Sequence, residues 1–135
     1  MAIDLTAEHK MLLALASKAQ KNAHAPYSNF YVGAAILDEN AQLHASCNVE
    51  NAAYPLGQCA EAGAISAMIA SGSKQIKQIL IASPNDKFCP PCGGCRQKIA
   101  EFADAQTEVH LATKNGQVKT VKFEALLPLA FGFDK

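Results

Sequence analysis

The sequence shows no excess of charge of either sign. Its 135 residues include 12 Lys and Arg and 12 Asp and Glu, so the formal net charge at pH 7 is zero. A chain without net positive charge is poorly suited to following a phosphate backbone, and a nucleic acid is not expected as a partner. Half of the residues are hydrophobic and 18% are charged, as in ordinary globular proteins.

Long hydrophobic runs are also missing. No apolar stretch approaches the roughly 18 residues that a membrane span needs, and the first ten residues lack the hydrophobic region of a signal peptide. Internal repeats, low-complexity segments and linker-like stretches are absent too. We therefore expect one domain over residues 1–135 and no membrane partner, in a chain long enough to bury a core.

The cysteine content argues against a disulfide framework. The chain has five cysteines, an odd number, and no secretory features. Reduced thiols that bind a metal in the cytoplasm explain this number better than disulfide bonds do. A cytoplasmic protein is expected.

Three of these cysteines form a metal-ligand pattern around Cys59-Ala60-Glu61 and the later segment PPCGGC, residues 90–95. Thiolates are soft ligands that zinc prefers, and three protein ligands leave the fourth tetrahedral position free for water, as in catalytic zinc sites. Glu61 follows a ligand by two residues and is placed to take a proton from that water. The pattern predicts a catalytic zinc site rather than a structural one.

The spacing of the ligands suits two helix N-termini. Cys92 and Cys95 stand at positions i and i+3, so one helical turn directs both sulfurs the same way. Cys59 would open another helix, and the partial positive charge at both helix starts favours thiolates. A C-A-E segment followed by P-C-x-x-C is typical of zinc-dependent nucleobase deaminases, in which the Glu acts as general acid and base.

The hydrophobic pattern predicts a three-layer α/β/α sandwich around a mixed sheet of about five strands. Asp4 or Thr6 can cap the first helix. Residues 48–58 are expected to form a loop that leads to the metal helix. The expected helices are 5–22, 60–70, 92–103 and a short one at 123–127, and the expected strands are 30–37, 42–49, 76–82, 108–113 and 117–121.

Four segments resemble cytidine deaminases of the small homotetrameric form with three cysteine ligands: PYSNFYVGAA, CNVENAAYPLGQCAE, PCGGCRQ and EALLPLAFG. The match runs from roughly Tyr27 to Phe131 and includes the segments between the ligands. The resemblance implies zinc-dependent hydrolysis of cytidine and deoxycytidine to uridine and deoxyuridine with release of ammonia, as in pyrimidine salvage. It implies one Zn²⁺ per subunit on Cys59, Cys92 and Cys95, whose hydroxide attacks C4 while Glu61 shuttles protons.

The resemblance also assigns the substrate-binding residues. Asn48 and Glu50 match a pair that hydrogen-bonds the ribose 3′-hydroxyl, Phe30 matches an aromatic residue of the base pocket, and the N–H of Ala60 matches a donor to the pyrimidine O2. The residues themselves support part of this, because Asn48 and Glu50 alternate along one face at a strand end. Without the resemblance, Phe30 would be expected to pack in the core.

Tyr54 and Phe131 match residues that reach the active site of a neighbouring subunit. The resemblance therefore implies a homotetramer whose active sites are shared between subunits. On residue type alone, an aromatic residue near the C-terminus such as Phe131 is an ordinary packing residue.

One position departs from the family pattern. The family often has Arg directly after the catalytic Glu, and here that position is Ala62. Three thiolates and Zn²⁺ carry a net charge of −1, which bound hydroxide would increase to −2. The helix N-termini, and Arg96 directly after Cys95, are the candidates to compensate this charge.

Other assignments stay open at this level. Buried thiols or a structural zinc knot would also explain three cysteines, and Cys89 could serve as a further ligand, although two prolines follow it. Cys47 is expected in the core. The four histidines are expected at exposed positions and none is assigned to the metal: His9, His24, His44 and His110.

Alternative functions keep the zinc site and change its use. The same chemistry could act on a modified cytosine nucleoside or a nucleoside antibiotic, or on a base within nucleic acid, which the neutral charge disfavours. A non-catalytic zinc-stabilised module that binds nucleosides would have no use for Glu61. Preference between cytidine and deoxycytidine does not follow from the residues.

Overall fold

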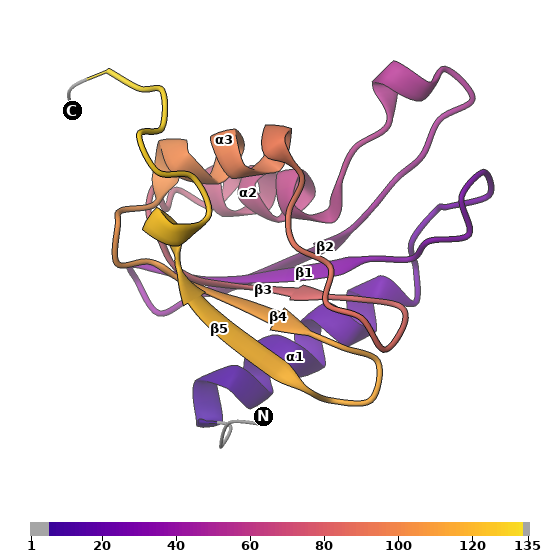
Figure 1. The fold of residues 1–135 in the computed structure, drawn as a ribbon, viewed down its shortest axis with the longest axis horizontal. Helices are drawn as coiled ribbons and strands as arrows, with labels where there is room; N and C mark the ends of the chain where they lie inside the picture. Colours follow the sequence, from indigo (N-terminus) through magenta and orange to yellow (C-terminus); the bar gives the residue numbers. More distant parts are fainter. Residues whose placement is uncertain (1–5, 134–135) are drawn as a thin grey trace.

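The computed structural model describes residues 6–133, and its centre is one sheet of five strands (Figure 1). The strand order is β2-β1-β3-β4-β5. Only the β3–β4 pair is parallel, and the other three pairs are antiparallel, so the predicted mixed sheet is confirmed. The strands are β1 (Gly33–Asp38), β2 (Leu43–Cys47), β3 (Ile76–Ala82), β4 (Glu108–Ala112) and β5 (Val118–Lys122).

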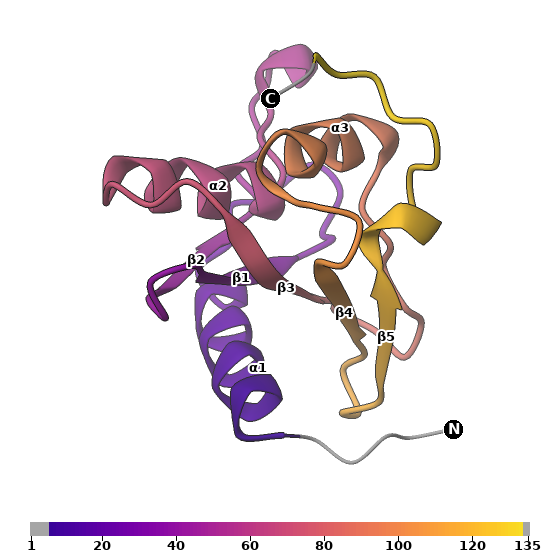
Figure 2. The ribbon, with the colours of Figure 1, turned by 90° about the vertical axis from the view of Figure 1, so that its left-hand side faces the viewer.

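Helices cover both faces of this sheet, which confirms the three-layer sandwich. Helix α1 (Ala7–Gln20) lies on one face, and α2 (Ala60–Ala70) and α3 (Gly93–Phe102) lie on the other (Figures 1 and 2). All six residues of β1 are buried because both of its faces are covered.

The strand period of two divides the core into two clusters. Ala34 and Ile36 of β1 belong to the cluster beneath α2 and α3, which also contains Met68 and Ile99. Ala35 and Leu37, which alternate with them along β1, belong to the cluster beneath α1, which contains Leu12 and Ala16. The nearly continuous apolar runs of β1 and β3 therefore fill both layers.

Thr6 caps α1, as one of the two expected candidates. Its hydroxyl accepts a hydrogen bond from the N–H of His9 at 3.1 Å, and Nδ1 of His9 accepts one from the N–H of Thr6 at 3.3 Å. Two of the free N–H groups at the helix start are satisfied in this way. The other candidate, Asp4, lies outside the described residues.

The expectation that all four histidines are exposed is wrong for His9 and His110, which are 8% and 0% exposed, and for His44, whose side chain is 9% exposed beside Asp38. Nε2 of His110 lies 2.8 Å from Oε1 of Gln78, and Nδ1 lies 2.7 Å from the hydroxyl of Thr120. Neighbouring strands thus satisfy both ring nitrogens, which permits burial of a polar ring. Burial, with a smaller contribution from His9, lowers the pKa of His110 to about 4.

Two extended segments project at the end of the sheet where α2 begins (Figure 1). The longer one contains residues 48–58 and ends in a short 3-10 helix, η1 (Tyr54–Leu56). The shorter segment is the chain between α1 and β1. Backbone bridges join Val49 of the longer segment to Gln58 of the same segment and to His24 of the shorter one, so the two segments are connected at their base. Near the C-terminus, the expected helix at 123–127 is a single 3-10 turn, η2 (Phe123–Ala125).

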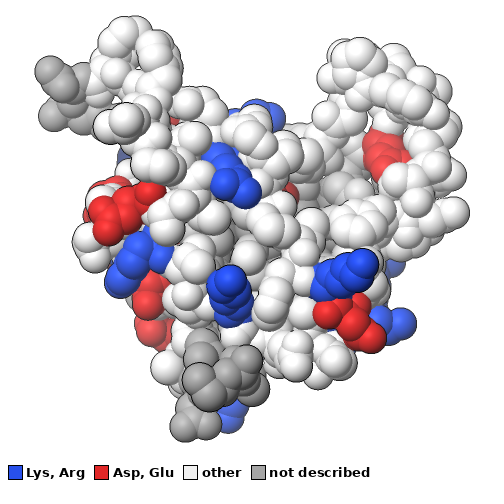
Figure 3. Space-filling view, in the orientation of Figure 1, with Lys and Arg blue, Asp and Glu red and all other residues white. Residues whose placement is uncertain are grey.

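Neither a membrane-spanning helix among the described residues nor a basic stripe on the face of Figure 3 is found. No helix within residues 6–133 is long and apolar enough to cross a bilayer. On the face shown in Figure 3, basic and acidic side chains are interspersed and uncharged residues cover most of the area.

Candidate metal centre

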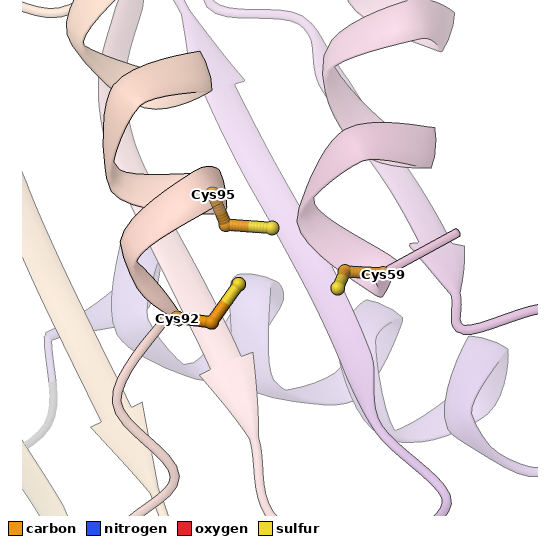
Figure 4. A group of neighbouring side chains, drawn as sticks. All are labelled: Cys59, Cys92 and Cys95. Carbon is orange, nitrogen blue, oxygen red and sulfur yellow. The ribbon is translucent and has the colours of Figure 1, made fainter. Parts of the chain in front are cut away.

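Three cysteine side chains converge where α2 and α3 begin (Figure 4). The sulfur atoms of Cys59, Cys92 and Cys95 all lie within 4.8 Å of one another. Cys59 is the N-cap residue of α2, Cys92 is the N-cap residue of α3, and Cys95 lies in the first turn of α3. Residues 33 positions apart in the sequence are therefore brought into one group by the packing of two helix starts.

The local sequence explains how α3 presents two of these thiols. Pro90 and Pro91 precede an extended Cys92 (φ −66°, ψ 168°), after which the helix begins. The side chain of Arg96 fixes this entry, because its Nε donates to the carbonyl of Pro91 at 2.8 Å and Nη1 donates to the carbonyl of Leu126 at 2.8 Å. The entry loop of α3 is thus tied to the segment that follows β5.

The thiol group fits a zinc ion with three protein ligands. In a tetrahedral site with Zn–S bonds of about 2.3 Å, the sulfurs are about 3.8 Å apart, and the three sulfurs here lie within 4.8 Å of one another, which is compatible with such a site. Within the described part of the chain, no fourth His, Cys, Asp or Glu side chain joins the group. Cys89 is half-buried and lies outside it, so the possibility of Cys89 as a ligand is not supported.

Without a metal, a hydrogen bond between two of the thiols shifts their pKa values in opposite directions. A hydrogen bond from Cys95 lowers the pKa of Cys59 to about 6 against the effect of burial, with smaller contributions from Cys92 and the positive charge of Lys98. The same hydrogen bond, together with burial and nearby negative charges, raises the pKa of Cys95 well above its usual range. The hydrogen bond thus favours the thiolate form of Cys59 over that of Cys95, and metal binding would require all three thiols to be deprotonated.

Lys98 was missed by the sequence reasoning, which considered Arg96 as the compensating charge. Both groups lie on α3: the guanidinium of Arg96 donates to two carbonyl groups, and the positive charge of Lys98 makes a small contribution to the lowered pKa of Cys59. The signal in the sequence was the spacing, since Lys98 follows Cys95 by three residues and so lies on the same side of the helix.

Glu61 lies beside the thiols in the first turn of α2 and is only 5% exposed. Burial raises the pKa of its carboxyl group above the usual range, and the negative charge of Cys59 adds to this effect while Lys98 opposes it. A raised pKa makes the protonated form of the carboxyl group easier to reach, which suits a group that accepts a proton and returns it. Its position beside the metal ligands is the one expected of a proton carrier.

A cavity of about 280 Å³ opens beside the thiols and Glu61. The structure brings four of the six predicted substrate-binding residues to its wall: Phe30, Asn48, Glu50 and Ala60. Ser28, Val32, Cys89 and Pro90 also line it, and none of them was expected among the substrate-binding residues. Ser28 and Val32 belong to the same PYSNFYVGAA segment as Phe30, which was the available signal.

Asn48 and Glu50 also hold the cavity wall in place. Oδ1 of Asn48 accepts the N–H of Val32 at 2.9 Å, and its Nδ2 donates to the carbonyl of Phe30 at 2.8 Å. The carboxylate of Glu50 accepts the N–H of Ser28 at 3.2 Å and the hydroxyl of the same residue. These bonds, led by the one from the Ser28 hydroxyl, lower the pKa of Glu50.

The comparison with protein families decides the identity. The model of the cytidine and deoxycytidylate deaminase zinc-binding region matches residues 6–111. The chain belongs to the cytidine deaminase family. Cytidine deaminase from Sporosarcina psychrophila is 38% identical over 120 residues, covering 89% of this chain and 88% of the relative. The relative from Halalkalibacterium halodurans is 36% identical over 124 residues, covering 92% and 94%.

Solved cytidine deaminases share the fold. The crystal structure from Burkholderia pseudomallei has a TM-score of 0.87 and 37% identity, covering 94% of this chain and all of that one. The structure from Mycobacterium tuberculosis has a TM-score of 0.83 and 30% identity, covering 95% and 100%. A zinc-binding family and a three-cysteine group compatible with one ion together identify zinc as the cofactor.

The two residues that the family resemblance assigns to a neighbouring subunit's active site do not line the cavity of their own chain. Tyr54 is 73% exposed on η1, where its ring lies 5.6 Å from that of Tyr27. Phe131 is 70% exposed, its ring lies 5.5 Å from that of Phe133, and Gln97 donates a hydrogen bond to its carbonyl. Neither Tyr54 nor Phe131 lines the 280 Å³ cavity of this cytidine deaminase family member.

Proposed function

We propose that this protein catalyses the zinc-dependent hydrolytic deamination of cytidine and deoxycytidine to uridine and deoxyuridine, with release of ammonia. The observation that carries the proposal is a single cavity in which an open three-cysteine metal site meets a buried carboxyl group. Relatives that align over about nine tenths of the chain are cytidine deaminases, which supports this substrate class.

Zinc, when bound, supplies Lewis-acid chemistry that makes water a good nucleophile at neutral pH. Cys59, Cys92 and Cys95 would hold the ion from the two helix N-termini, whose partial charges stabilise the thiolates. The carboxylate of Glu61 would accept a proton from the attacking water as the water oxygen bonds to C4 of the base, and would return the proton to the amino group, so that the C4–N bond breaks and ammonia leaves. Burial keeps this carboxyl group away from bulk water, which would otherwise compete for the proton.

The cavity wall supplies groups for the base and the sugar. Phe30 packs against the base, and Ala60, the first residue of α2, offers an N–H group without a partner inside the helix to the pyrimidine O2. The side chains of Asn48 and Glu50 bind the ribose 3′-hydroxyl. Each keeps capacity for this, because an amide nitrogen has two N–H donors and a carboxylate has about four acceptor positions.

The active unit is proposed to be a homotetramer with shared active sites. Exposed large apolar side chains lie on η1 and on the C-terminal segment, and such exposure is typical of protein interfaces. In the tetramer, Tyr54 and Phe131 would complete a neighbour's cavity. Analytical sedimentation of the protein tests whether it forms a tetramer. Mixing Phe131→Ala chains with inactive Glu61→Gln chains tests whether active sites are shared between subunits, because activity should then be regained. The side chains concerned are Tyr54, Leu56, Leu129, Phe131 and Phe133.

The setting of the reaction follows from the thiols and the substrate. All five cysteines are free, and thiolate ligands persist in a reducing compartment, which supports the cytoplasm. Conversion of cytosine nucleosides to uracil nucleosides fits pyrimidine salvage. We infer that residues 1–135 act as one domain, since the described elements belong to one sheet and the helices packed on it.

The ultraviolet spectrum of cytidine incubated with zinc-loaded protein tests the proposal. Loss of cytosine absorbance with formation of uridine and ammonia is expected, and Glu61→Gln should reduce the rate by about 10²-fold or more while zinc content stays near one per chain. Unchanged cytidine in the presence of one equivalent of zinc would overturn the substrate assignment. Equal rates for the parent protein and Glu61→Gln would remove Glu61 from the mechanism.

A further inference from the structure

A second cavity, of about 680 Å³, lies on the α1 side of the sheet, away from the metal centre. It is bounded by the C-terminal half of α1, the end of β3 and the hairpin that joins β4 to β5. Its volume is within the range of about 300–1,000 Å³ typical of sites for small molecules. The proposed function makes no use of it.

The charge lining this cavity is of one sign. Lys21 and Lys114 line it, and no Asp or Glu does. Neither ammonium group has an ion-pair partner among residues 6–133. The C-terminus of α1, which ends at Gln20, adds a partial negative charge of about half a unit, which the two lysines outweigh. Uncompensated positive charge in a concave, partly apolar site concentrates anions.

The remaining wall is mostly apolar and held in place, although Ser17, Ser83 and Thr113 also line it. Leu13, Ala82 and Pro84 provide aliphatic surface, and Tyr31 adds an aromatic residue. Nε2 of Gln20 donates to the carbonyl of Tyr31 at 2.9 Å and to that of Ala82 at 3.2 Å, so the cavity is formed without a ligand. An apolar wall beside two ammonium groups suits a flat apolar body that carries an anionic group.

We propose that this cavity is a second ligand site, specific for a small aromatic anion such as an aryl phosphate, and that its occupation changes the affinity of the substrate cavity. The two cavities share one segment of extended chain. Tyr31 lines the second cavity, whereas Phe30 and Val32 on either side of it line the cavity beside the thiols. The side chain of Asn48 is bonded to the backbone of both neighbours, so a shift of Tyr31 reaches the substrate side directly.

Titration calorimetry of the zinc-loaded protein with phenyl phosphate tests the site. Phenyl phosphate is expected to bind at least tenfold more tightly than phenol or inorganic phosphate, since only it has both parts. The double variant Lys21→Gln, Lys114→Gln should weaken binding at least tenfold. The control Lys77→Gln, Lys119→Gln removes the same charge from residues that do not line the cavity, and should change binding by less than twofold.

Several results would overturn the site: no binding of phenyl phosphate, equal losses in both double variants, or displacement of phenyl phosphate by uridine as a simple competitor. The coupling rests on the proposed function, because it is measured as at least a twofold change in KM for cytidine at saturating phenyl phosphate. The Lys21→Gln, Lys114→Gln protein should lose this change. An unchanged KM with lysine-dependent binding would refute the coupling, and the calorimetry stands whether or not cytidine is the substrate.

Discussion

Gly63 determines how closely α2 approaches β2, and its replacement by Ala tests how the helix that carries a metal ligand is positioned. A Cβ atom at position 63 would lie 2.2 Å from Oγ and 2.9 Å from Cβ of Ser46, where ordinary contact begins at 3.4 Å. The hydroxyl can rotate away, but the Cβ atom of Ser46 is fixed by the backbone of β2. The variant must therefore separate α2 from β2 by about half an ångström.

The expected loss of stability is a balance of two effects. Overpacking of a buried contact costs about 1–3 kcal/mol, and the change from Gly to Ala inside a helix gains up to about 1 kcal/mol. Gly63→Ala should thus lower the free energy of unfolding by about 1 kcal/mol. Gly93→Ala is the matched control, because it lies in α3 and its Cβ would meet nothing within 4 Å. It should leave stability unchanged or raise it by up to about 1 kcal/mol.

Urea unfolding of the metal-free protein measures this difference. With a slope near 2 kcal/mol per molar urea, a gap of about 2 kcal/mol between the two variants separates their midpoints by about 1 M. Ser46→Gly removes both contacting atoms and should restore most of the loss in the Gly63→Ala background. Gly63→Ala should also weaken zinc binding, because α2 begins at Cys59. Equal midpoints for Gly63→Ala and Gly93→Ala, without recovery by Ser46→Gly, would refute the packing argument.

Three further predictions concern buried or half-buried groups. The pKa of His110 is about 4 in the folded protein and near 6.5 in the unfolded chain. The free energy of unfolding should therefore fall by up to about 3 kcal/mol as the pH drops from 6.5 to 4. In urea unfolding of the metal-free protein, His110→Asn should make the midpoint less dependent on pH. Arg96→Gln should lower the free energy of unfolding by about 2 kcal/mol in the same assay, because two carbonyl groups lose a charged donor. Arg96→Lys should show a similar loss, since an ammonium group lacks the planar fork of a guanidinium. Stability equal to that of the parent protein in Arg96→Lys would indicate that the charge alone matters. Cys89→Ser should keep one zinc per chain in metal analysis whereas Cys92→Ser should not, and zinc loss in Cys89→Ser would contradict the three-ligand site.

Most elements of the fold could be predicted because their local signals agree with their tertiary surroundings. The apolar runs of β1 and β3 indicated strands covered on both faces, and the structure buries them between α1 and the pair α2 and α3. The boundaries of α2 and β3 agree with the expected ranges. Differences occur at ends, where the expected helix at 123–127 is a single 3-10 turn.

The histidines show what local patterns miss. His110 alternates with apolar neighbours in β4, and nothing within its own strand shows that Gln78 and Thr120 will face it from the two adjacent strands. Burial of a polar ring depends on partners from other strands, which are far away in the sequence. The cavity beside α1 was missed for the same reason, since its two lysines are more than 90 positions apart.

The sequence by itself determined the chemistry of the metal centre. Ligand type, the i, i+3 spacing of Cys92 and Cys95, and the carboxyl group two residues after Cys59 are local properties, so they can be read without a fold. The tertiary structure decided that the two helix starts meet, that burial raises the pKa of Glu61, and that the charge of Lys98 contributes to the lowered pKa of Cys59. Distances and solvent exposure depend on packing between distant segments, and spacing along the chain does not encode them.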